Sequence, residues 1–184
     1  MAAPIRGNRH LNRQNRPVFT GPLTSDSVKV YADGGLGSRG GCLVQPDADK
    51  PKETGFLLST EKQFRDLAKE LAASKFQMNT HAIGDSANRI ILNIYGAALH
   101  GQKDRRWRIE HAQVITPADM PKFGQFGIVP SVQPTHAPSD LYWAGRRPGA
   151  ARRNTAHPYP RLRDALRPAA RGPDDTGTRW DWIR

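Results

Sequence analysis

Cysteine is almost absent from this 184-residue chain, which contains only Cys42. No disulfide bond can therefore form within the chain, and a reducing compartment fits this composition. Long apolar runs are also missing, because no stretch approaches the roughly 20 residues that span a bilayer. Residues 1–17 are basic but lack the apolar segment of a secretory signal. These absences exclude an intrachain disulfide framework, and they predict a cytoplasmic protein that makes no membrane contact.

Acidic residues are scarce relative to basic ones, and the formal net charge is +11. Such an excess often indicates an acidic partner such as nucleic acid. The basic charge lies at the two ends, however, since residues 1–20 carry four arginines and no acid, and residues 144–184 carry ten arginines and four acids. Residues 21–143 carry fourteen basic and thirteen acidic side chains. A nucleic-acid-binding module is therefore the weakest of the functional hypotheses, and no nucleic-acid partner is predicted.

Periodic apolar residues are missing from both ends of the chain. Residues 1–27 are rich in Arg, Asn and Pro, and residues 144–184 are rich in Arg, Pro, Ala and Gly. Segments of this kind bury too little apolar surface to fold by themselves. We therefore predict a basic, poorly ordered segment at 1–27, one folded segment at 28–143, and a disordered tail at 144–184.

The folded segment alternates strand patterns with helix patterns. Short apolar strand patterns occur at residues 28–32, 76–81, 107–111 and 128–132. Helices are expected after Thr60, which forms a capping box with Gln63, after Asp85 as a cap, and from Thr116 with Pro117 at the first helical position. This alternation favours an α/β fold with a parallel sheet and crossover helices.

Two histidines stand at the ends of successive predicted strands, His81 and His111. Side chains at the carboxyl ends of neighbouring parallel strands face the same crevice. The strands lie about 4.8 Å apart, so the two imidazoles can share one metal ion through Zn–N bonds of about 2.0–2.1 Å. Packing at a strand end is the commoner role for either histidine alone, but their common position favours the metal site. Alternation directs Glu110 away from the His111 face, which predicts a structural role for this carboxylate.

The sequence allows either a structural or a functional role for four further residues. Lys29 lies inside a strand pattern, where a buried ammonium would be costly, so it faces either solvent at a sheet edge or a functional site. Asp33 precedes two glycines and is expected to form a turn. Gln133 and His136 follow the last strand, where substrate-contacting loops belong, and they are candidate substrate-binding residues, with an ordinary loop as the alternative.

Four segments together resemble the amidohydrolase family 3 proteins, a group that includes N-substituted formamide deformylase. They read VKVYADGGLGSR at 28–39, NTHAIGD at 79–85, RIEHAQ at 108–113 and PSVQPTHA at 130–137. The resemblance covers about residues 27–143. It implies part of a distorted TIM-type (β/α) barrel that hydrolyses non-peptide C–N bonds of small-molecule amides or formamides.

The resemblance also implies one or two divalent metals at the carboxyl ends of the strands. His81 and His111 match the metal-binding histidines of the fifth and sixth strands. Lys29 matches the fourth-strand position at which many superfamily members carry a carbamylated, metal-bridging lysine. Neutral imidazoles with an anionic carbamate would suit zinc, and the bound metal would activate water for attack on the amide.

Two family features are absent from this sequence. The family has a His-X-His pair on its first strand, whereas the only histidine before His81 is His10. The family also has a catalytic Asp at the end of its eighth strand, and the aspartates after Trp143 lie in a different context. The catalytic set is therefore incomplete, and we expect a truncated or frameshifted product. An inactive barrel fragment remains the alternative to a hydrolase that receives its missing ligands from another segment.

Overall fold

A computed structural model describes residues 18–20, 23–47, 49–133 and 135–136. Four parallel strands in this part of the chain form one sheet in the order β3–β4–β5–β6. They are β3 (Ser27–Tyr31), β4 (Gln77–Ala82), β5 (Arg108–His111) and β6 (Val129–Ser131). The connections contain α1 (Glu61–Ala72), α2 (Asp85–Leu99), the short 3-10 helix η1 (Lys103–Arg105) and α3 (Met120–Phe126). The predicted alternation of strands and helices around a parallel sheet is confirmed.

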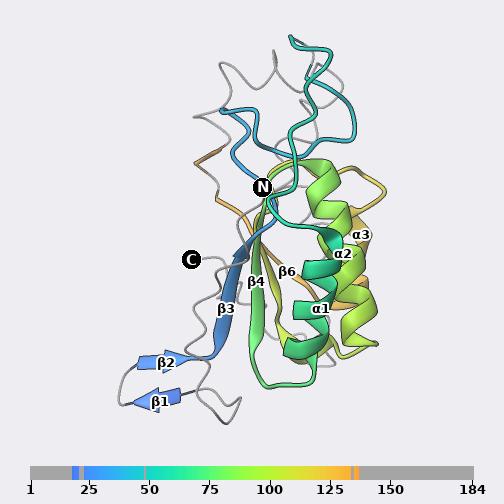
Figure 1. Ribbon diagram of the computed structural model, residues 1–184. Coiled ribbons are helices and arrows are strands. Elements are labelled where there is room, and N and C mark those ends of the chain that lie inside the picture. Colours follow the sequence, from blue (N-terminus) through green and yellow to red (C-terminus); the bar gives the residue numbers. More distant parts are fainter. Residues whose placement is uncertain (1–17, 21–22, 48, 134, 137–184) are drawn as a thin grey trace.

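The two faces of the sheet differ sharply in polarity. The helices α1, α2 and α3 lie on one side of the sheet (Figure 1), where Val30, Met78 and Ile109 are buried in the main apolar core. Because side chains alternate along a strand, the residues between them point to the other side, which we call the inner face. Strand pairing arranges the inner face in two rows, namely Lys29, Asn79, Arg108 and Val129, and then Tyr31, His81, Glu110 and Ser131.

The starts of the three helices agree only in part with their sequence signals. Thr60 and Gln63 form the expected capping box at the start of α1. At α2 the cap residue is Gly84, and Asp85 instead accepts a hydrogen bond from the Val44 amide 2.8 Å away. The expectation that Asp85 caps α2 is therefore wrong, because a more distant backbone donor occupies its carboxylate.

The third helix begins later than its sequence signal predicts. The start expected with Thr116 as the cap and Pro117 as the first helical residue is wrong, because α3 begins at Met120. Thr116 instead opens a turn, in which its carbonyl accepts from the Asp119 amide at 3.0 Å and its hydroxyl donates to the Asp119 carboxylate at 2.6 Å. The predicted stop is confirmed, since Gly127 ends the helix with a φ of 68°.

A hairpin precedes the parallel sheet. Strands β1 (Val18–Thr20) and β2 (Leu23–Ser25) pair antiparallel within the segment that was expected to lack regular structure. Residues 1–17 and the predicted tail at 144–184 lie outside the described residues. Among the helices of the described ranges, none has the length and apolar character needed to cross a bilayer.

Arg105 joins the end of α1 to the sheet. Its guanidinium donates to the carbonyl oxygens of Leu71, Ala72, Ser74 and Phe76 at 2.8–3.1 Å. These include carbonyls that the last helical turn leaves without an intrahelical partner. We predict that Arg105→Ala lowers the free energy of unfolding by about 2 kcal/mol, since charge-assisted hydrogen bonds contribute about 1.5–3 kcal/mol.

Urea unfolding followed by circular dichroism measures this loss. Arg105→Lys should restore less than half of it, because an ammonium cannot reproduce the planar fork of donors. Arg106→Ala is the matched control, because that side chain is 75% exposed. Equal losses in Arg105→Ala and Arg106→Ala would contradict the assigned role.

Candidate metal centre

The two histidines at the strand ends do come together. Their ring centroids lie 4.6 Å apart with an interplanar angle of 71°. Two nitrogens that bind one zinc ion through bonds of about 2.0–2.1 Å must lie within about 4 Å of each other. The separation of the rings is compatible with this requirement, so His81 and His111 can serve one cation.

The two histidines do not occupy the same position in the sheet register, however. His81 pairs with Glu110, and His111 pairs with Ala82, one residue further on. Alternation alone would place His111 on the helix side of the sheet. The backbone at His111 is left-handed, with a φ of 73°, and the ring nevertheless packs edge-on against the His81 ring. The expectation of a common strand position is therefore corrected, because a local turn compensates for the offset.

Gln133 fixes the orientation of the His111 ring. The Gln133 side-chain nitrogen donates to the Ser131 carbonyl at 3.0 Å, so its oxygen faces His111 Nδ1 at 2.6 Å. Because an amide oxygen only accepts, Nδ1 must carry the proton, and Nε2 keeps the lone pair that a metal needs. Gln133, which was predicted to contact substrate, thus lies beside a candidate ligand as its orienting partner.

His81 presents a nitrogen that lacks a hydrogen bond. Its Nε2 is buried without a hydrogen-bond partner among the described residues, and the Asp33 Oδ1 atom lies 3.7 Å away. Burial lowers the pKa of His81 to about 4, and the nearby His111 ring acts in the same direction. Burial also lowers the pKa of His111, although its hydrogen bond with Gln133 opposes this effect. Both rings are therefore neutral near pH 7, which is the form that binds metal.

Asp33 is not only a turn residue. It is a buried carboxylate on which several backbone amides converge, and we call it a hub. Its carboxylate accepts from the amides of Cys42, Ile83 and Gly84 at 2.8–2.9 Å. Burial raises the pKa of Asp33 to about 6, while these backbone donors oppose the rise. The carboxylate therefore ties the loop after β3 to the turn after β4, directly beyond His81. Its sequence signal was a carboxylate at a strand end, which alone does not distinguish such a hub from a turn.

Lys29 and Glu110 both belong to the inner face. Lys29 is exposed in the first row of the inner face, one row before His81, and its Nζ lies 5.3 Å from the centroid of the Tyr31 ring. Partial burial lowers the pKa of Lys29, and Glu110 opposes this shift. Glu110 shares the row of His81, and Arg108 Nε lies 3.2 Å from its carboxylate. The expectation that Glu110 and His111 face opposite sides is therefore wrong, since the left-handed backbone at His111 turns its ring toward His81, whereas the structural role of Glu110 stays a prediction.

The donor set in the described ranges is partial. The His136 ring lies 5.6 Å from the His111 ring, so this candidate substrate contact also borders the site. In that part of the chain, no group of three or more His, Cys, Asp or Glu side chains is arranged to hold a metal ion. The two neutral imidazole nitrogens fit a contribution of two ligands to a divalent cation, and Lys29 is the adjacent candidate for a third.

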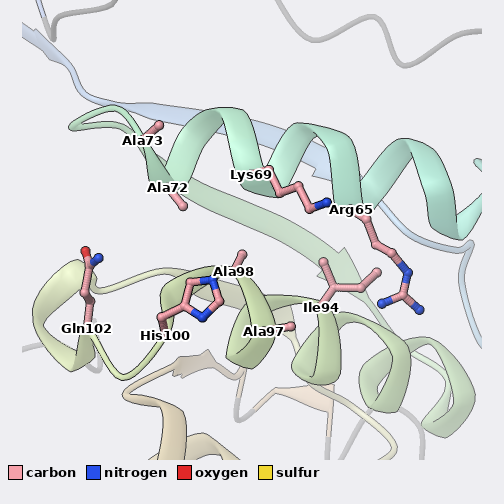
Figure 2. A pocket seen from close by; sticks show the side chains of 9 residues that line it. All are labelled: Arg65, Lys69, Ala72, Ala73, Ile94, Ala97, Ala98, His100 and Gln102. Carbon is pink, nitrogen blue, oxygen red and sulfur yellow. The ribbon is translucent and has the colours of Figure 1, made fainter.

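A groove of about 580 Å³ lies elsewhere, between α1 and α2 (Figure 2). Small apolar side chains and the cations Arg65 and Lys69 line it, and His100 and Gln102 lie at the helix-end side. The helices run antiparallel to the strands. The carboxyl ends of the helices therefore lie near the amino ends of the strands, away from His81 and His111. This groove is therefore separate from the candidate metal centre.

Comparisons with known proteins show the family and the fold of this chain. The model of the Amidohydrolase family matches residues 8–181. Protein LONG AFTER FAR-RED 3 from Arabidopsis thaliana is 36% identical over 144 residues, which are 77% of this chain and 25% of that protein. YtcJ from Bacillus subtilis (strain 168) is 30% identical over 146 residues, which are 78% of this chain and 27% of YtcJ. The chain thus spans about a quarter of the length of these curated relatives.

A solved structure is also similar. The crystal structure of an uncharacterized metal-dependent hydrolase from Pyrococcus furiosus superimposes with a TM-score of 0.71 at 28% identity. The match covers 79% of this chain and 30% of the other. Together with the family match, it confirms the predicted fold class, a partial TIM-type (β/α) barrel.

Proposed function

Because this chain belongs to the amidohydrolase family, we propose that it supplies part of a metal-dependent active site that hydrolyses non-peptide C–N bonds in small amides or formamides. The observation that carries the proposal is the pair of neutral imidazoles at the ends of β4 and β5. His81 offers a buried nitrogen that has no hydrogen bond to any described residue, and Gln133 leaves the Nε2 lone pair of His111 available. A hydrolase of this type needs such neutral nitrogen donors at the carboxyl ends of its strands.

His81 and His111 would hold the divalent cation, and Lys29, as a carbamate, would be the third ligand on this chain. Zinc suits this donor set, because imidazole and anionic oxygen are its common ligands. When bound, such a cation lowers the pKa of its bound water toward about 7 and polarises a carbonyl oxygen. The family resemblance rather than the fold supports the choice of an amide or formamide substrate.

The surrounding residues have separate tasks in this proposal. Gln133 holds the proton of His111 on Nδ1, and Asp33 fixes the backbone that follows His81. Tyr31 stands 55% exposed beside the His81 ring, with centroids 5.2 Å apart, and offers an aromatic wall to a small substrate. His136, on the other side of His111, would contact the substrate from the loop after β6.

Calorimetric titration of the chain with Zn²⁺ tests the proposal. We expect His81→Ala and His111→Ala each to weaken Zn²⁺ binding by about 100-fold or more, since loss of an orienting partner alone costs about 10- to 100-fold. His100→Ala is the matched control, because His100 is an exposed residue at the far end of α2. Any amide or formamide hydrolysis by the chain should depend on added Zn²⁺ and be lost in the same two variants. Unchanged Zn²⁺ affinity in both variants would refute the site.

A further inference from the structure

Asn88 is a fully buried polar residue in the first turns of α2. Its side-chain nitrogen lies 2.9–3.3 Å from four backbone carbonyl oxygens, those of Ala82, Ile83, Gly84 and Val114. Since all four neighbours are acceptors, only the NH₂ group of the amide can face them, and the opposite orientation would set oxygen against oxygen. The two N–H groups are therefore shared among four carbonyls.

These carbonyls belong to two separate turns. Ala82, Ile83 and Gly84 directly follow His81 at the end of β4, and Val114 lies three residues after His111. The turns also touch through one backbone hydrogen bond, from the Val114 amide to the Ile83 carbonyl at 2.9 Å. Asn88 thus binds both segments from the helix side, while the imidazoles occupy the other side.

We propose that Asn88 is a positioning residue that sets the spacing of His81 and His111 by clamping the turns behind them. It acts through the backbone, since its side-chain nitrogen donates to backbone carbonyl oxygens. The inference rests on the proposed function to the extent that these two histidines bind the metal. The left-handed backbone at His111 makes such a clamp necessary, because a strained turn persists only where its surroundings hold it.

Tyr95 provides a matched control on the same helix. Its hydroxyl lies 2.6 Å from the Thr80 hydroxyl and donates toward the Met78 and Arg108 carbonyls at 3.1 and 3.3 Å. Tyr95 therefore also bridges β4 and β5 from α2, but along the strands and not at the turns. Tyr95→Phe removes a buried bridge of similar polarity and leaves the turns untouched.

The test is titration of the chain with Co²⁺, monitored by its visible absorption. We expect Asn88→Ala to weaken Co²⁺ binding by about 10- to 100-fold, as is typical when a residue that orients metal ligands is lost. Asn88→Ser, which keeps one donor, should recover part of the affinity, and Tyr95→Phe should stay within about threefold of the unmodified chain. Equal weakening in Asn88→Ala and Tyr95→Phe would overturn the proposal, as would unchanged affinity in Asn88→Ala.

Amide hydrogen exchange separates this proposal from the proposed function. If Co²⁺ binding proves independent of His81 and His111, the metal site is refuted. Amide hydrogen exchange alone then tests whether Asn88 clamps the two turns. Asn88→Ala should then accelerate exchange of the Val114 amide relative to the Leu92 amide within α2, whereas Tyr95→Phe should not. Equal relative exchange in the two variants would overturn the clamp.

Discussion

Replacing Asp33 by alanine is expected to lower the free energy of unfolding by about 3–4 kcal/mol. The substitution leaves three backbone amides, those of Cys42, Ile83 and Gly84, without their acceptor. A buried donor that loses its partner costs about 1–3 kcal/mol, although relaxation of the loop lets water reach some of them. Removing a carboxylate whose burial raises its pKa to about 6 offsets part of the loss. The free-energy cost of leaving three buried amides without an acceptor is larger than that gain.

Urea unfolding of Asp33→Ala and Asp33→Asn measures this effect. Asp33→Asn should show an intermediate loss, because its single oxygen can still accept while its NH₂ group faces a donor. Asp66→Ala is the control, since that exposed carboxylate pairs with Lys62 on the surface of α1. This substitution should change stability by less than about 0.5 kcal/mol. A loss in Asp33→Ala no larger than in Asp66→Ala would contradict the hub.

Gly84→Ala should produce the second large loss, about 2–3 kcal/mol. A Cβ atom at position 84 would lie 2.6 Å from the Cys42 backbone nitrogen and closer still to its carbonyl group. The neighbour is backbone, so it cannot move aside as a side chain would. The Cys42 carbonyl also accepts from the Ser86 and Ala87 amides at the start of α2. Displacing it therefore loosens the helix start, and such overpacking typically costs about 1–3 kcal/mol or more.

Thermal unfolding of Gly84→Ala compared with Gly35→Ala tests this close approach. The Cβ of Gly35→Ala would meet only the flexible Ser38 hydroxyl, at 3.4 Å, and its stability should fall by less than about 1 kcal/mol. Zn²⁺ affinity of Gly84→Ala should also fall, because residue 84 lies in the turn behind His81. A fully stable Gly84→Ala variant would show that the Cys42 backbone lies elsewhere.

The strands and the candidate histidine pair could be predicted from sequence because both depend on short-range patterns. Apolar runs locate the four strands within about one residue of their observed bounds. His81 and His111 were found because each ends such a run. The capping box at Thr60 was likewise a local signal, and it formed as expected.

The remainder depends on contacts between residues far apart in the chain. Asp33 receives amides from residues 50 and 51 positions later, and no periodicity encodes such a partner. The same holds for Asp85, whose carboxylate accepts a hydrogen bond from the Val44 amide, 41 positions earlier in the chain. Glu110 was misjudged for a different reason. Simple alternation puts Glu110 and His111 on opposite faces, and the sequence does not reveal the left-handed backbone that turns His111 back toward the inner face.

The left-handed backbone at His111 restricts which side chains could replace this histidine in the proposed metal site. A φ of 73° strongly disfavours most residues, whereas His, Asn and Asp adopt positive φ several times more often than other non-glycine residues. Of the common zinc ligands, Cys and Glu therefore suit the position poorly, and glycine would fit the backbone without offering a donor. The fold thus limits a ligand at position 111 to an imidazole or a short oxygen ligand, so backbone conformation itself would select the chemistry of the proposed donor.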